Sequence, residues 1–173
     1  MGTLADMPAP DAVPDSAVLP VVLAPGATAP ARAHDDDAGF DLCAAEDAVL
    51  PPLGRALVGT GVSIALPPGT VGLVCPRSGL AVRHGVTVLN GPGIVDAGYR
   101  GELRVALVNT DAREEFAIRR GDRIAQLVIV PFLASVLRET DRLDDSTRAD
   151  HGFGSSGGFG HDPRTGDDQG QEG

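Results

Sequence analysis

The sequence predicts an all-β domain, a jelly-roll-like β-barrel or sandwich with one short helix, on three observations. Its 173 residues are enough for one domain with a full core. Apolar residues make up 42% of the chain, but the aromatic residues are only five Phe and one Tyr, so the core must rest on Val, Leu, Ile and Ala, which suit strands. The 23 Gly and 14 Pro are typical of short strands joined by tight turns.

Period-two apolar patterns place the strands between residue 18 and about residue 138. The first expected strand is Val18–Leu23, with Pro20 marking an edge or end. The last is Ile124 to Val130, ended by Pro131. Between them, the alternating positions are Val62, Ile64 and Leu66, then Val71, Leu73 and Cys75 on the other side of a Pro-Pro-Gly turn, then Leu103, Val105 and Leu107.

Composition divides the chain into four parts. Residues 1–16 are rich in Ala, Pro and Asp and are expected to be flexible, and residues 17–143 form the β domain. Residues 144–160 form a Gly- and Ser-rich arm with almost no aliphatic side chains, which should not fold alone. Residues 161–173 are expected to be a disordered polar tail.

Charge and cysteine usage exclude several classes of function. A net charge of −10 disfavours binding to bulk nucleic acid or to an anionic membrane. All 14 basic residues are Arg, so a Walker-type Lys loop and a lysine nucleophile are excluded. We expect no signal peptide and no membrane span. Cys43 and Cys75 lack CxxC spacing, which predicts buried free thiols and a cytoplasmic protein.

A helix is expected from Ser78 to His84, with Ser78 as its N-cap and Gly85 closing it. The preceding Pro76 and Arg77 end a strand, so backbone N–H groups, a guanidinium and a hydroxyl gather at the positive end of the helix dipole. Such a segment can bind an anion. The alternative is an ordinary N-cap turn with a surface Arg.

The Gly-rich segment Asn90–Glu102 predicts a β-hairpin that opens onto a pocket, where backbone groups could bind a base edge. Asp96 follows two apolar residues, a placement suited to a general base, although an Asx-turn aspartate is the alternative. Gln126 is a polar residue inside an apolar run and needs a partner, which could be a ligand or a hydrogen bond within the protein. Phe40, Tyr99, Phe153 and Phe159 lie in polar, Gly-rich segments, where an aromatic ring can stack on a ligand.

Five segments in this order resemble the five motifs of the trimeric dUTPase family. They are Ala38–Leu42, Pro76–Ala81, Gly93–Glu102, Gly121–Leu127 and Arg148–Gly158. The resemblance spans about residues 18–160. It implies a β jelly roll that assembles as a homotrimer, with active sites at subunit interfaces and an arm that closes over a neighbouring subunit's site. The implied reaction is Mg²⁺-dependent hydrolysis of dUTP to dUMP and pyrophosphate, which keeps uracil out of DNA and supplies dUMP for dTMP synthesis.

The resemblance also implies roles for individual residues. Asp96 would activate the attacking water, Tyr99 would exclude a 2′-hydroxyl, and Asn90 with the hairpin backbone would recognise uracil. Asp41 would help to organise water around Mg²⁺, which the triphosphate itself would hold without a direct protein ligand. Arg77, Ser78 and Gln126 would bind phosphates, with Gly79 letting the backbone approach. On the arm, the implied residues are Arg148, Ser155 and Ser156 for the distal phosphates, beside Gly154, and Phe153 for stacking on uracil.

The sequence departs from the family pattern at two places. Ile94-Val95 stands where Thr-Ile is usual, and Ala149 and His151 stand where glycines are common. Two alternatives stay open: a dCTP deaminase or bifunctional enzyme, which shares the fold, and a non-catalytic nucleotide-binding regulatory trimer. Ser78-Gly79 and Asp96 differ from the doubled serine and the catalytic glutamate of the deaminases.

Overall fold

The structure is a computed structural model that describes residues 18–142 and residue 144. The chain divides after Ser135 into two units, and every helix and strand of the described residues belongs to the first. That first unit is built of strands with one short helix, which confirms the expected fold class. The described residues include no helix with the length and apolar character needed to cross a membrane.

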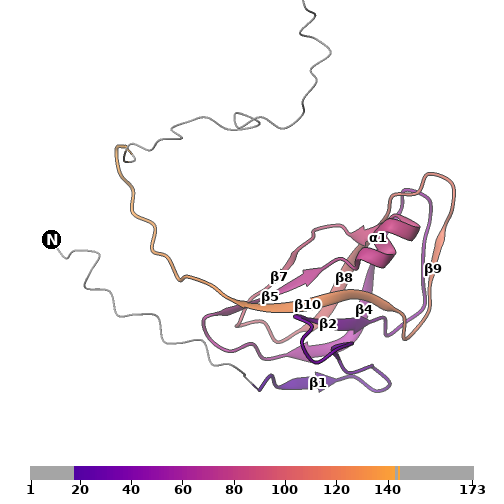
Figure 1. The fold of residues 1–173 in the computed structure, drawn as a ribbon, viewed down its shortest axis with the longest axis horizontal. Coiled ribbons are helices and arrows are strands. Elements are labelled where there is room, and N and C mark those ends of the chain that lie inside the picture. Colours follow the sequence, from indigo (N-terminus) through magenta and orange to yellow (C-terminus); the bar gives the residue numbers. More distant parts are fainter. Residues whose placement is uncertain (1–17, 143, 145–173) are drawn as a thin grey trace, which may run out of the picture. The chain divides into compact units, whose positions relative to one another are not determined.

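Two four-stranded antiparallel sheets and a two-stranded ribbon make up the first unit (Figure 1). The first sheet has the order β1 (Val21–Leu23), β4 (Arg55–Ile64), β8 (Glu102–Asn109) and β6 (Val86–Val88). The second has the order β2 (Gly39–Cys43), β10 (Arg123–Pro131), β5 (Thr70–Cys75) and β7 (Gly93–Val95). The ribbon pairs β3 (Ala48–Leu50) with β9 (Phe116–Ile118).

The inner faces of the two sheets share one aliphatic core. The alternation expected on β8, at the end of β4 and just beyond it is confirmed, because these positions are all buried: Val62, Ile64, Leu66, Leu103, Val105 and Leu107. Leu42 and Leu127 bring the second sheet into the same core and are fully buried. Stacked sheets of this kind fill the space between them with alternate side chains from both.

Only one of the two cysteines expected to be buried is buried, because of the way β5 faces the core. Val74 points into the core, between its β10 partner Leu127 and its β7 partner Gly93. Since neighbours on a strand point to opposite faces, Cys75 lies on the outer face and is half-exposed. Cys43 is buried as predicted, and its burial, followed by the nearby Asp41 carboxylate, raises the pKa of its thiol. A raised pKa disfavours the reactive thiolate at Cys43.

Helix α1 (Ser78–His84) has the predicted bounds, but its N-cap is Arg77 and not Ser78. The Arg77 carbonyl accepts hydrogen bonds from the N–H groups of Leu80 and Ala81, so the helix begins one residue earlier than a Ser78 cap requires. A guanidinium cannot accept a hydrogen bond, and no side chain caps the first turn. Gly85 ends the helix in the left-handed conformation, with φ 62°, as expected.

Asn109 fastens the end of β8 to the ribbon and to the loop that follows. Its buried Nδ2 donates to the carbonyls of Leu50, Pro51 and Glu114 at 3.2, 3.3 and 2.8 Å, and its Oδ1 accepts from the N–H of Asp111 at 2.9 Å. One side chain therefore satisfies several backbone groups that water cannot reach freely.

We expect Asn109→Ala to lower the free energy of unfolding by about 2–3 kcal/mol, because buried backbone carbonyls lose their donor. Urea denaturation at fixed protein concentration measures the change. Thr110→Ala is the matched control, since the exposed Thr110 hydroxyl makes one hydrogen bond, to the Gly85 carbonyl, and its loss should cost about 1 kcal/mol or less. Equal losses in the two variants would contradict this role of Asn109.

Candidate active site

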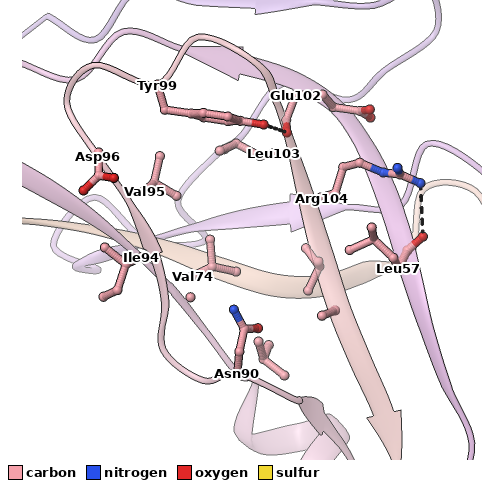
Figure 2. A pocket seen from close by; sticks show the side chains of 14 residues that line it. Leu57, Val74, Asn90, Ile94, Val95, Asp96, Tyr99, Glu102, Leu103 and Arg104 are labelled. Carbon is pink, nitrogen blue, oxygen red and sulfur yellow. Dashed lines mark hydrogen bonds between the residues drawn. The ribbon is translucent and has the colours of Figure 1, made fainter.

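The hairpin between β7 and β8 forms one wall of a pocket of about 330 Å³, which we call the hairpin pocket (Figure 2). Asn90, Asp96 and Tyr99 all line it, as the predicted base-binding hairpin requires. Asn90 lies at the opposite end of the pocket from Tyr99 in Figure 2. A Cβ at Gly93 would come within 3.3 Å of the Asn90 Nδ2, so Gly93 makes room for this amide against the hairpin.

Hydrogen bonds within the hairpin fix its tip. The N–H of Tyr99 donates to the Asp96 carbonyl at 3.0 Å, which closes a tight turn. The Arg100 guanidinium donates to the carbonyls of Ala97 and Tyr99 at 2.6 and 2.7 Å. The Tyr99 hydroxyl donates to the Glu102 carbonyl at 2.9 Å. The side chains of the tip are therefore presented on a braced backbone.

Asp96 is exposed at this tip, and none of the described residues donates a hydrogen bond to its carboxylate. Capping aspartates elsewhere in the chain differ. The Asp111 carboxylate accepts the N–H groups of Arg113 and Glu114, and these bonds, that of Glu114 first, lower the pKa of Asp111. Asp96 enters its turn through its backbone carbonyl, so the Asx-turn alternative does not describe it.

A second pocket, also of about 330 Å³, lies where β2, β10 and the start of α1 meet, and we call it the arginine pocket. Arg77 Nε lies 3.1 Å from one Asp41 carboxylate oxygen, and Arg123 Nη1 lies 3.0 Å from the other. Arg77 also donates to the Arg123 carbonyl at 3.1 Å. One carboxylate thus orients two guanidinium groups, each of which keeps further N–H donors for an anion.

Ser78, Gly79 and Gln126 also line the arginine pocket. Gln126 Nε2 donates to the Pro76 carbonyl at 2.9 Å. Of the two partners expected for Gln126, a ligand or a group within the protein, the structure therefore shows the second. That bond ties β10 to the residue just before Arg77. The Gln126 amide oxygen lies where a Cβ of Gly39 would be 2.5 Å away, so Gly39 is needed for the side chain to fit.

The structure therefore sorts the predicted residues into two groups. Asn90, Asp96 and Tyr99 share the hairpin pocket, whereas Asp41, Arg77, Ser78, Gly79 and Gln126 share the arginine pocket. The two pockets have no lining residue in common. The predicted arm residues Arg148, Phe153, Gly154, Ser155 and Ser156 lie outside the described residues.

Sequence reasoning missed Arg123 as a site residue. It begins β10 inside the fourth motif-like segment, directly after Gly121-Asp122, so its charge beside a turn was a usable signal. What the sequence could not supply is the partner, because Asp41 and Arg123 are 82 residues apart and meet only through the pairing of β2 with β10.

The donor set fits a magnesium ion that arrives with phosphate groups. Among the described residues, no group of three or more His, Cys, Asp or Glu side chains could hold a metal ion. Asp41 is the acidic group nearest the two guanidinium groups and is already paired with both. Mg²⁺ usually keeps several waters and is bound partly through substrate phosphates, so Asp41 would organise water around such an ion rather than coordinate it.

The chain matches the family dUTPase over residues 26–157, a range that includes every residue of both pockets named above and the predicted arm residues. This chain belongs to the dUTPase family. It is 56% identical over 136 residues to the deoxyuridine 5′-triphosphate nucleotidohydrolase of Rhodococcus erythropolis, covering 79% of this chain and 83% of that protein. The corresponding protein of Nocardia farcinica is 53% identical over 146 residues, covering 83% and 88%.

Solved dUTPase structures share the fold of this family member. The dUTPase of Staphylococcus bacteriophage 80alpha with dUpNHpp has a TM-score of 0.76 and 33% identity, covering 82% of this chain and 99% of that one. A mutant dUTPase of phage phi11 of S. aureus, described with a structural Mg(II) ion, has a TM-score of 0.68 and 30% identity, covering 73% and 98%. The jelly-roll-like arrangement expected from the sequence is thus that of known dUTPases.

Proposed function

We propose that this dUTPase hydrolyses dUTP to dUMP and pyrophosphate by attack of a water molecule that Asp96 activates. The water oxygen bonds to the α-phosphorus, the bond to the bridging oxygen of the β-phosphate breaks, and pyrophosphate leaves. The water proton passes to the Asp96 carboxylate. This role rests on the position of the Asp96 carboxylate, which lies at the rim of the hairpin pocket and accepts no hydrogen bond from any described residue.

Base and sugar recognition belong to the hairpin pocket. Asn90 and the backbone beside it would bind the uracil edge, and a base of the wrong polarity would leave buried polar groups unpaired. The Tyr99 ring would lie against the deoxyribose and fill the room that a 2′-hydroxyl needs. Relatives named for deoxyuridine triphosphate support this substrate.

Phosphate binding belongs to the arginine pocket. The Arg77 guanidinium, the Ser78 hydroxyl and the uncapped first turn of α1 supply donors, and Gly79 lets the backbone come close. Gln126 acts here through its bond to Pro76 and through contact with the phosphates. Mg²⁺ bound to the triphosphate would neutralise charge at the transferring phosphorus, and Asp41 would organise water around it.

We further propose that the site is assembled from several copies of the chain in a homotrimer. Asp96 and Arg77 serve one substrate in the proposed reaction but line separate pockets of a single chain. A second copy that sets its hairpin pocket against the arginine pocket of the first would complete the site. Residues 144–160 would close it as an arm, with Arg148, Ser155 and Ser156 on the phosphates, beside Gly154, and Phe153 over the base.

We place the protein in the cytoplasm, where its free thiols Cys43 and Cys75 would stay reduced. There the reaction would keep uracil out of DNA and supply dUMP. The same location suits a substrate drawn from the nucleotide pool.

The test is pyrophosphate release with Mg²⁺ from dUTP, dCTP, dTTP and UTP in parallel. We expect release from dUTP alone, because the pocket selects both base and sugar. Release of ammonia from dCTP would instead indicate a deaminase or bifunctional enzyme. Binding of dUTP without release from any of the four would indicate a regulatory trimer.

A further inference from the structure

The Tyr99 ring is folded back onto its own hairpin. A Cβ built at Gly101 would lie 2.5 Å from the Tyr99 hydroxyl oxygen, 2.7 Å from Cζ and 3.1 Å from Cε2. Real Cβ atoms do not approach heavy atoms this closely, so any side chain at residue 101 must displace the ring. The absence of a side chain at Gly101 therefore determines where the aromatic wall of the hairpin pocket stands.

Glu102 helps to position the same ring, directly through its backbone carbonyl and indirectly through its carboxylate. Its backbone carbonyl accepts the Tyr99 hydroxyl proton at 2.9 Å, as Figure 2 shows. Its carboxylate accepts the N–H of Gly61 at 2.7 Å. Gly61 lies in the irregular part of β4, where the register against β8 shifts between Gly59 and Ser63 and φ reaches +66°.

This carboxylate bond ties the acceptor of the Tyr99 hydroxyl to a neighbouring strand. Without it, the N–H of Gly61 would lose its partner. The start of β8 would then be held to β4 by the pairing of Glu102 with Ser63 and by the Thr60 hydroxyl, which donates to the Leu103 carbonyl at 2.6 Å. The acceptor of the Tyr99 hydroxyl would have one hydrogen bond fewer to hold it against β4. The position of the ring therefore depends on the space left by Gly101 and on the two hydrogen bonds that Glu102 accepts.

We propose that Gly101 and Glu102 are positioning residues that hold the Tyr99 ring where it discriminates deoxyribose from ribose. The inference rests on the proposed function, in which the ring occupies the room of a 2′-hydroxyl. Gly101 and Glu102 act through Tyr99 and need not touch the substrate.

The first test compares kcat/KM for dUTP with kcat/KM for UTP. We expect Gly101→Ala and Glu102→Ala to lower this ratio by about tenfold, since a displaced ring admits the extra hydroxyl. Glu102→Gln should restore it, because its amide oxygen can still accept the Gly61 N–H. The matched control is Glu46→Ala: Glu46 accepts the Gly59 N–H at 3.0 Å in the same part of β4, but its bond does not go to the hairpin. It should lower Tm and leave the ratio unchanged.

The second test does not depend on hydrolysis. Tyr99 is the only tyrosine and the chain has no Trp, so intrinsic tyrosine fluorescence reports this ring alone. We expect lower anisotropy in Glu102→Ala than in the wild type or in Glu102→Gln, and altered emission in Gly101→Ala. If wild-type protein did not hydrolyse dUTP, the proposed function would fail while the fluorescence still decided the positioning.

A wild-type ratio and wild-type anisotropy in Glu102→Ala would overturn the inference, and so would a ratio that falls equally in Glu46→Ala. Should Gly101→Ala fail to fold, the Glu102→Ala and Glu102→Gln pair decides the question by itself. A loss in the first and recovery in the second would support the proposal.

Discussion

Asp96→Asn is expected to lower kcat for dUTP by roughly 10²–10⁴-fold while nucleotide binding stays close to that of the wild type. Asparagine keeps the size and the hydrogen-bonding shape of the side chain but cannot accept a proton from water at neutral pH. Because Asp96 contributes only its backbone carbonyl to the hairpin turn, the substitution leaves the fold of the tip in place. Single-turnover hydrolysis gives the chemical step, and calorimetric titration with the analogue dUpNHpp gives the affinity.

Asp111→Asn is the matched control for the loss of one exposed negative charge. The amide oxygen of the new side chain can still accept the N–H groups of Arg113 and Glu114, so activity and stability should both be retained. A near-normal kcat in Asp96→Asn would remove Asp96 from the role of general base. Loss of dUpNHpp affinity with an unchanged chemical step would instead make it a binding residue.

Strands long enough to show period-two alternation could be predicted from the sequence, and several of the shorter ones could not. β8 and β10 have eight and nine residues, which is enough to repeat the pattern. β3, β6 and β9 have three residues each and present too few positions to separate a strand from a turn. β1 is a three-residue strand that the sequence did predict, as the end of Val18–Leu23, and it begins at Val21 because Pro20 has no N–H for the ladder.

The types of residue in the candidate site could be predicted from the sequence, but their arrangement in space could not. Asp96 and Arg77 stand out because a carboxylate and a guanidinium beside Gly-rich turns suit phosphate chemistry. That they belong to separate pockets depends on the order of the strands, which pairs β2 with β10 and β5 with β7. Residue type alone favours Ser78 as the N-cap, whereas the extended backbone of Arg77, φ −101° and ψ 125°, decides where α1 begins.

Arg77→Ala is expected to lower kcat/KM for dUTP by roughly 10²–10³-fold, as for the loss of one preorganised donor to developing charge. The substitution removes one of the two guanidinium groups that pair with Asp41, together with the hydrogen bond from Arg77 to the Arg123 carbonyl. Asp41 and Arg123 remain paired, so the arginine pocket should stay folded. Steady-state kinetics with dUTP measures the loss, and Arg83→Ala, which removes a bond to the Gly79 carbonyl on the exposed side of α1, is the control with expected activity near the wild type.

Mixed trimers of Asp96→Asn and Arg77→Ala chains should recover activity that neither variant has alone. If each site takes Asp96 from one copy and Arg77 from the next around a closed ring, a trimer containing both variants has about one intact site in three. Co-expression with two affinity tags and selection on both isolates such trimers. Pairing Asp96→Asn with a chain that carries both substitutions provides the control. Every site then lacks Asp96, so activity should stay at the level of the Asp96→Asn variant alone. If Asp96 and Arg77 acted within a single chain, the mixed trimers would also stay at the floor, since every chain would then lack one of the two residues.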